Sequence, residues 1–225
     1  MTHRRRQFEA DGRLWLRNAV GSAQLNALSS LIPERGKPGQ RIESDAWVHE
    51  HLVRSGLNEA LTDLWPSARP VRLVAFDKAA DANWGLPWHQ DRVIAVQDRV
   101  DLPGFDNWSK KAAIWHCEPP VAVLNDMLFV RVHLDPSTSD NGAMEIALGS
   151  HLHGRMPSQE AASYAKSCQT EITLAEPGDV LVLSMLTLHR SRPSRTTDRR
   201  RVLRVDYALS PLPHPLQWAF TDIDA

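Results

Sequence analysis

The 225-residue sequence predicts a mainly β protein with flanking helices. Two observations support this fold class. Turn-forming residues recur often and the apolar runs between them are mostly short, which is typical of a β-rich core. In addition, the run VLVLSMLTLH (180–189) is apolar at consecutive positions, as expected for a central strand packed on both faces of a sandwich or barrel. Because 42% of the residues are hydrophobic, we predict a single domain spanning 1–225 with one sizeable core.

The expected elements follow from turn signals and periodicity. Ser22 can cap a helix that ends before Pro33, and Ser55 can cap a second that ends before Pro66, because leucines follow each Ser at helical spacing. A further helix is expected from Ser158. Short apolar runs predict strands at 71–76, 121–134, 144–148, 171–175, 180–189 and 201–209. We expect the last two strands to pair antiparallel, and the helices to cover a sheet.

Composition and charge favour a small-molecule partner. Lys and Arg total 26 against 27 Asp and Glu, so the chain has no long-range attraction for nucleic acid or for an anionic membrane. Two cysteines are too few for a secreted disulfide framework. No apolar run is long enough for a signal peptide or a membrane span, so we expect a cytoplasmic location.

A possible metal site begins at His89 and Asp91, in the stretch LPWHQD. Residues i and i+2 of a strand point to the same side, so both side chains can reach one ion. The sequence offers three rival pairs with the same spacing: His49 with His51, His133 with Asp135, and His151 with His153. A third ligand is needed to choose among them.

His189 can supply that third ligand, because it ends a strongly apolar run in which a polar side chain needs a specific reason. Two imidazoles and one carboxylate form the facial triad that holds iron(II) and leaves positions open for substrate and oxygen. Arg200 follows eleven positions later and opens the next predicted strand. Antiparallel pairing can return its guanidinium toward the metal, where it can bind a carboxylate through two hydrogen bonds.

These residues, with other segments, resemble the phytanoyl-CoA dioxygenase family of Fe(II)- and 2-oxoglutarate-dependent oxygenases. FEADGRLWL (8–16) resembles the family's opening, LPWHQD its first metal motif, and NGAMEIALGSH (141–151) its Asn-Gly and Pro-Gly-Ser-His segments. HRSRPSRTTDRRR (189–201) is similar to the segment with the distal His and the oxoglutarate Arg. Leu148 stands where the family usually has Pro. The resemblance implies a double-stranded β-helix, that is, a jelly-roll, cupin-like barrel with flanking helices.

The resemblance assigns roles to the candidate residues. It implies that His89, Asp91 and His189 are the catalytic metal ligands, and that the pair at 133 and 135 is not used. It further implies that Arg200 and Ser191 bind the distal carboxylate of 2-oxoglutarate.

Arg201 remains an alternative for the carboxylate. It shares the apolar side of its predicted strand, which taken alone favours Arg201 as the inward residue. The eleven-residue spacing favours Arg200, provided that helices cover the apolar side of the sheet.

The resemblance implies that the protein hydroxylates an unactivated C–H bond in a small molecule. Fe(II) would be the metal cofactor, 2-oxoglutarate and O2 would be consumed, and succinate and CO2 would be released. Asp91 occupies the position that halide-transferring relatives leave open, so hydroxylation, desaturation or ring formation is preferred. The stretch 92–120 has no clear period and is expected to be the substrate loop. Candidate substrate contacts are Trp84, Trp88, Lys78 and His116.

Two other classes of protein remain open. The first is a cupin-like metalloenzyme that does not use 2-oxoglutarate. It would account for the three metal ligands but would give Arg200 no ligand to bind. A non-catalytic jelly-roll binding protein explains the fold but leaves the ionisable triad unexplained.

Overall fold

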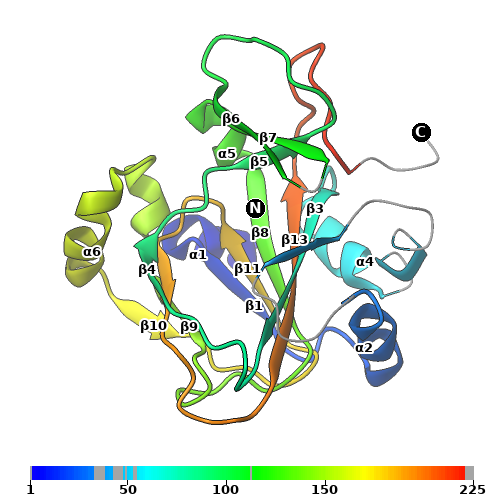
Figure 1. Cartoon of the computed structure of the whole chain (residues 1–225), viewed down its shortest axis with the longest axis vertical. Coiled ribbons are helices and arrows are strands. Elements are labelled where there is room, and N and C mark those ends of the chain that lie inside the picture. The colour runs from blue at the N-terminus through cyan, green and yellow to red at the C-terminus, as the bar shows by residue number, and fades with distance from the viewer. Residues whose placement is uncertain are drawn as a thin grey trace.

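The computed structural model describes residues 2–32, 39–42, 48, 50–52, 55–111 and 113–220. Two antiparallel sheets of six and four strands form the two sides of a double-stranded β-helix (Figure 1). The mainly β jelly-roll fold with flanking helices is therefore confirmed. No helix in the described ranges has both the length and the apolar character needed to cross a membrane.

The larger sheet supplies one wall of the barrel. Its strands lie in the order β1 (Arg13–Leu16), β11 (Val180–Ser184), β8 (Met127–His133), β13 (Arg200–Ala208), β3 (Arg69–Lys78) and β2 (Gln40–Ile42). Side chains alternate between its two faces. In β13, Leu203, Val205 and Tyr207 join the outer core, so the even-numbered side chains face into the barrel.

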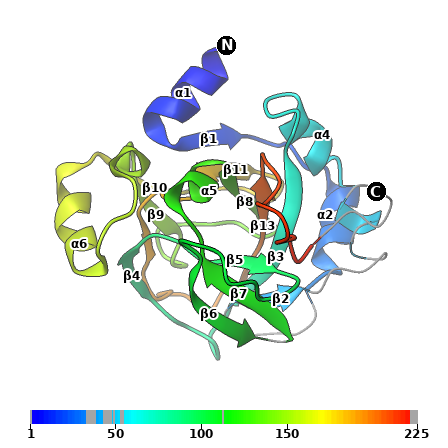
Figure 2. The same cartoon turned by 90° about the horizontal axis from the view of Figure 1, so that it is seen from above.

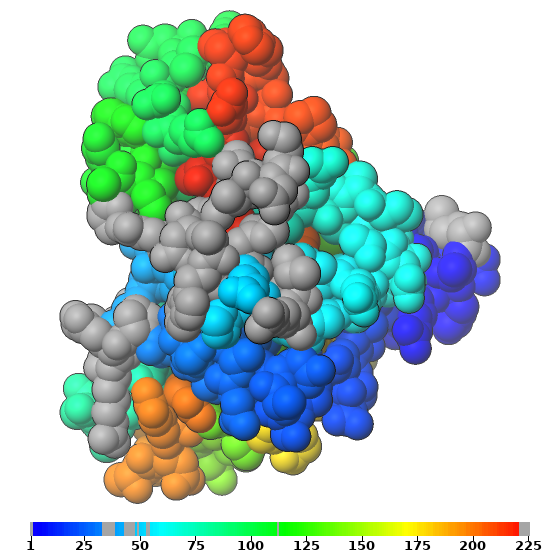
Figure 3. All heavy atoms as spheres, turned by 90° about the vertical axis from the view of Figure 1, so that its right-hand side faces the viewer, coloured from blue at the N-terminus to red at the C-terminus, as the bar shows by residue number. Residues whose placement is uncertain are grey.

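Helices cover the outer face of this sheet. They are α1 (His3–Asp11), α2 (Ser22–Ser29) and α4 (Leu57–Thr62). Phe8, Leu28 and Leu61 from these helices belong to the same buried cluster as Leu203 and Val205. Figure 3 looks onto the side where α2 and α4 lie against the barrel. The apolar side of β13 is thus the outer side, as the choice of Arg200 over Arg201 requires.

The smaller sheet forms the opposite wall and carries the metal-ligand candidates. Its strands lie in the order β10 (Thr170–Ile172), β9 (Met144–Ala147), β12 (His189–Ser191) and β4 (Leu86–His89). The helix predicted from Ser158 is confirmed as α6 (Ser158–Ser167), which packs beside β4 (Figure 2). A short 3-10 helix, η1 (Ser150–His153), follows β9.

The expected substrate loop at 92–120 contains a third, three-stranded sheet rather than an irregular loop. Its strands are β5 (Ile94–Val96), β7 (Ile114–Glu118) and β6 (Asp106–Lys111). They are short and separated by turns, which is why the sequence showed no clear period. This sheet lies at one end of the barrel beside the C-terminal stretch, where Val96 pairs with Trp218 (Figures 1 and 3).

Two strand predictions and one pairing prediction were wrong. The run 121–134 is divided into α5 (Val121–Asn125) and β8, because a turn at Asp126 separates them. The run 180–189 is divided between the two sheets, since the chain leaves the larger sheet after Ser184 and enters the smaller one at His189. The predicted antiparallel pairing of the last two strands was wrong, because β8 lies between them: β11 pairs with β1 and β8, and β13 pairs with β8 and β3. The second helix begins at Leu57, with the Ser55 hydroxyl accepting a hydrogen bond from the Leu57 amide.

Candidate metal centre

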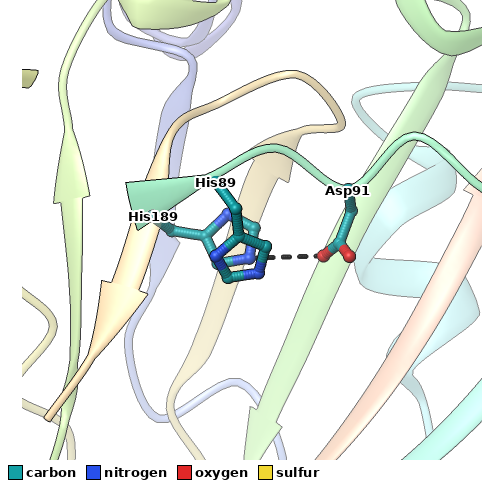
Figure 4. A group of neighbouring side chains, drawn as sticks. All are labelled: His89, Asp91 and His189. Carbon is teal, nitrogen blue, oxygen red and sulfur yellow. Dashed lines mark ion pairs between the residues drawn. The ribbon is translucent and has the colours of Figure 1, made fainter. Parts of the chain in front are cut away.

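Pairing of β4 with β12 brings the three predicted metal ligands together. His89 and His189 are direct partners across the two strands, and Asp91 follows two residues after His89. The ligand atoms of His89, Asp91 and His189 all lie within 4.8 Å of one another (Figure 4). His189 Nε2 is 3.3 Å from Asp91 Oδ2. This group of side chains comes from segments about one hundred residues apart in the sequence.

Both imidazoles are oriented by main-chain carbonyls. His89 Nδ1 lies 2.7 Å from the Pro87 carbonyl oxygen, and His189 Nδ1 lies 3.0 Å from that of Thr187. A carbonyl only accepts, so each Nδ1 carries the proton and each Nε2 keeps its lone pair. Fixing the tautomer in this way is typical of histidines that bind a metal. The donor set of two nitrogens and one carboxylate fits iron(II).

A buried arginine supports the carboxylate of this group. Arg204, on the inner face of β13, contacts Asp91 Oδ2 and binds Asp206 through its Nε at 2.6 Å. Burial raises the pKa of Asp91, but the charge of Arg204 and the contact with His189 outweigh burial and hold that pKa well below its usual value. Burial and the charge of His189 lower the pKa of His89. The carboxylate is therefore ionised and the His89 ring favours its neutral form, which are the states that bind a metal.

The three ligands face a cavity of about 160 Å³ inside the barrel. Its apolar lining comes from Phe76, Trp84, Leu86, Phe129 and Met144. Its positive lining comes from Arg131, Arg190, Arg200 and Arg204. Asp91 is the one carboxylate that lines the cavity in the described part of the chain, so positive charge predominates there.

The predicted carboxylate clamp residues lie in this cavity. Arg200 is buried and lines it together with Ser191, and its Nε donates to the Asn141 carbonyl at 3.2 Å. Arg201 points to the other side of the sheet, where it makes two hydrogen bonds of 2.8 Å to Asp135. The geometry thus leaves Arg200, and not Arg201, available to a ligand in the barrel.

Side chains of the rival His-x-Asp and His-x-His pairs make other contacts, away from the three candidate ligands. His133 is buried, and its Nδ1 lies 3.1 Å from the Asp179 carbonyl, while Asp135 binds Arg201. His151 Nε2 contacts the Glu9 carbonyl at 3.1 Å. The remaining pair includes position 49, which lies outside the described residues.

Only one of the four candidate substrate contacts lines the cavity at the candidate metal ligands. Trp84 lines the cavity. Trp88 does not, because alternation turns it away from His89 toward a small cluster beside α6, so its prediction as a pocket wall was wrong. Lys78 is buried and donates to the Arg192 carbonyl at 2.7 Å.

His116 lies away from the metal cavity. It is buried in a small separate pocket of about 20 Å³, and its Nε2 accepts a hydrogen bond from Arg41 at 3.1 Å. A direct contact with substrate at the metal is therefore not indicated for His116.

Arg131 and Arg204 line the cavity but were not among the residues predicted from the sequence. Both are charged residues inside otherwise apolar strands, which was the available signal, since a buried charge requires a partner. The contact of Arg204 with Asp206 lies within β13, whereas its contact with Asp91 requires β13 and the chain after β4 to lie side by side.

The double-stranded β-helix and the three candidate ligands facing its interior form a site whose donors fit a non-haem metal ion. The family model for phytanoyl-CoA dioxygenase (PhyH) matches residues 8–202. The chain therefore belongs to this family of Fe(II)- and 2-oxoglutarate-dependent oxygenases, which confirms the resemblance, the enzyme class and the cofactors expected from the sequence. No curated protein matches the sequence.

Several solved structures share the fold. AviO1 from Streptomyces viridochromogenes Tue57 is 16% identical, with a TM-score of 0.63 over 94% of this chain and 96% of that chain. The 2-oxoglutarate-dependent carbocyclase SnoK from nogalamycin biosynthesis is 12% identical, with a TM-score of 0.65 over 92% and 83%. HygX from Streptomyces hygroscopicus, solved with nickel and 2-oxoglutarate bound, is 17% identical, with a TM-score of 0.59 over 92% and 87%.

Proposed function

We propose that the protein hydroxylates an unactivated C–H bond of a small molecule, with Fe(II) held by His89, Asp91 and His189. The observation that carries this proposal is the meeting of three metal-ligand side chains at one point, with both Nδ1 atoms engaged by carbonyls, inside a cavity that also holds Arg200. When bound, iron couples the oxidative decarboxylation of 2-oxoglutarate by O2, which yields succinate and CO2, to oxidation of a substrate C–H bond.

The chain's own residues position the reactants. Arg200 would bind the distal carboxylate of 2-oxoglutarate, and the Ser191 hydroxyl, which lines the same cavity, would donate to it. Arg204 orients Asp91 by contacting one of its two oxygens. Apolar side chains such as Phe129 and Met144 line the cavity and would exclude water from the reaction.

The stretch 92–120 would cover the substrate. It begins directly after Asp91, and its three strands lie at one end of the barrel. The net charge of −1 for the whole chain supports a small-molecule substrate over a nucleic acid. The similar structures include a carbocyclase and an epimerase. The products to be tested therefore include cyclised and epimerised forms of each substrate as well as hydroxylated ones.

The test is turnover of labelled 2-oxoglutarate. Protein loaded with Fe(II) without oxygen is exposed to air with 2-oxoglutarate, alone and with a panel of small molecules. Succinate should form slowly without substrate and faster with one, and Asp91→Ala should abolish both. If protein that binds iron forms no succinate with any compound tried, the proposal is contradicted. That result would favour a cupin-like enzyme that does not use 2-oxoglutarate.

A further inference from the structure

A row of alternating charges runs from the inner face of the larger sheet to Asp91, which follows β4 of the smaller sheet. Arg72 lies 2.7 Å from Asp206, Asp206 binds Arg204, and Arg204 contacts Asp91. Two guanidiniums and two carboxylates thus form a continuous chain without net charge. The positive charges that remain in the barrel are not neutralised by this chain.

Arg131 is a third buried guanidinium beside this chain. It lies on β8 directly opposite Arg204 of β13, on the same face of the sheet. Only 6% of its surface is exposed, and its Nε has no hydrogen-bond partner. Among the described residues Arg131 makes no ion pair and no hydrogen bond. An unpartnered charge in this position is costly unless a ligand supplies the partner.

Two aromatic rings hold the Arg131 guanidinium in place. Its Cζ atom lies 5.6 Å from the ring centroid of Phe76 and 5.9 Å from that of Phe129. Contacts with aromatic faces attract a cation without using its N–H groups. The donors of Arg131 therefore remain available, and Arg131 lines the same cavity as the three metal ligands and Arg200.

Positive charges act on Arg131 more strongly than the negative charge of Asp91 does. Burial, then Arg200, then Arg204 lower the pKa of Arg131 to about 9. Burial, then Arg200 and Arg131, lower the pKa of Lys78 to about 7. In the described part of the chain, no ion pair joins a carboxylate to any of Arg131, Arg200 or Lys78. Within the ranges that the structure describes, Asp91 acts on Arg131, and Asp135 on Arg200, only through their charge, without an ion pair or hydrogen bond.

We propose that Arg131 is a second guanidinium for the distal carboxylate of 2-oxoglutarate, which it would bind together with Arg200. The proposal rests on the proposed function, and it assigns a role to a residue that the metal site does not use. The two arginines come from different strands of the same sheet, so they can approach one carboxylate from two sides. The negative charge of the ligand would then satisfy the unpartnered Arg131 side chain.

The test compares two ligands on matched variants. Fe(II)-loaded protein is titrated without oxygen with 2-oxoglutarate and with 2-oxopentanoate, which has the same chain but a methyl group in place of the distal carboxylate. Binding is followed by the visible charge-transfer band that chelation of a 2-oxo acid produces. The variants are Arg131→Met, Arg131→Lys, Arg200→Met and, as a control, Arg201→Met, whose guanidinium lies outside the barrel.

Arg131→Met should weaken binding of 2-oxoglutarate by about tenfold or more, because it removes a charge-assisted contact to a carboxylate. Binding of 2-oxopentanoate should be unchanged, and Arg131→Lys should recover part of the loss. A merely structural role for Arg131 would weaken both ligands equally, and this result would overturn the proposal.

The outcome also separates this proposal from the proposed function. If the wild-type protein binds 2-oxoglutarate and Arg200→Met weakens that binding while Arg131→Met does not, the role of Arg131 alone is wrong. If the wild-type protein shows no band with 2-oxoglutarate, the proposed function itself is wrong.

Discussion

Replacing Arg204 by Met should destabilise the protein strongly, because it leaves two buried or half-buried carboxylates with one cation. In the wild type, Arg72 and Arg204 balance Asp91 and Asp206. In Arg204→Met, Asp206 keeps its contact with Arg72, but Asp91 loses its contact with a guanidinium. Arg204 is 4% exposed and Asp206 is 1% exposed, so water cannot replace the missing partner.

The magnitude follows from that burial. Removing one partner of a buried pair costs about 3–5 kcal/mol, since the remaining charge is left uncompensated. For a chain of this length each kcal/mol lowers Tm by about 2–4 °C, so we expect a loss of about 6–20 °C. Adding Asp206→Asn restores the balance of one cation and one anion and should recover much of the loss. Bound metal should also reduce it, because the ion supplies positive charge beside Asp91.

The assay is thermal unfolding of the wild type, Arg204→Met and the double variant, each with and without Co(II) as a redox-stable substitute for iron. The double variant should melt above Arg204→Met in both conditions. A Tm loss under about 2 °C for Arg204→Met, or no recovery in the double variant, would refute the charge-balance argument.

Three further predictions concern other parts of the barrel. Arg200→Met should raise the Kd for 2-oxoglutarate at least tenfold, since a bidentate contact to a carboxylate contributes roughly 1.5–3 kcal/mol, whereas Arg201→Met should leave it nearly unchanged in the same anaerobic titration. Gly142→Ala should lower Tm by about 4 °C or more, because φ is 74° and a Cβ would lie 2.5 Å from the Arg192 carbonyl oxygen; an unchanged melting curve would count against the turn geometry. Burial, with neighbouring positive charge, lowers the pKa of His133 to about 3 from 6.5, so the imidazole contributes stability above pH 6.5 that is lost as pH falls toward 3. The metal-free protein should lose about 2 kcal/mol between pH 6.5 and 5 from this group, and denaturant titrations should show a smaller loss in His133→Gln.

The metal ligands could be predicted from the sequence because the signals are local. Alternation along one strand places His89 and Asp91 on one side, and His189 is conspicuous in an apolar run. The choice of Arg200 depended on knowing that helices cover the apolar side of β13, which the family resemblance implied and the buried cluster of Leu203 and Val205 bears out.

Strand partners and the polar interior could not be predicted, because they depend on contacts between distant segments. The run 180–189 shows no local sign that the chain changes sheets after Ser184. Arg204 and Asp206 pair with each other within β13, but the contact of Arg204 with Asp91 joins distant segments. Arg131 has no charged partner among the described side chains, so no pairing could have been predicted for it. Trp88 is a different case, because strand alternation alone places it on the side opposite to His89; only its packing against α6 depends on the tertiary fold.

Anaerobic binding of Fe(II) decides whether His89, Asp91 and His189 form the iron site. Metal content is measured for the wild type, His89→Ala and His133→Gln, and 2-oxoglutarate is then added while the visible spectrum is followed. We expect the wild type and His133→Gln to bind one ion per chain and to develop the charge-transfer band, because ligation needs His89 and not His133. His89→Ala should do neither. Loss of metal in His133→Gln with retention in His89→Ala would contradict the site described here.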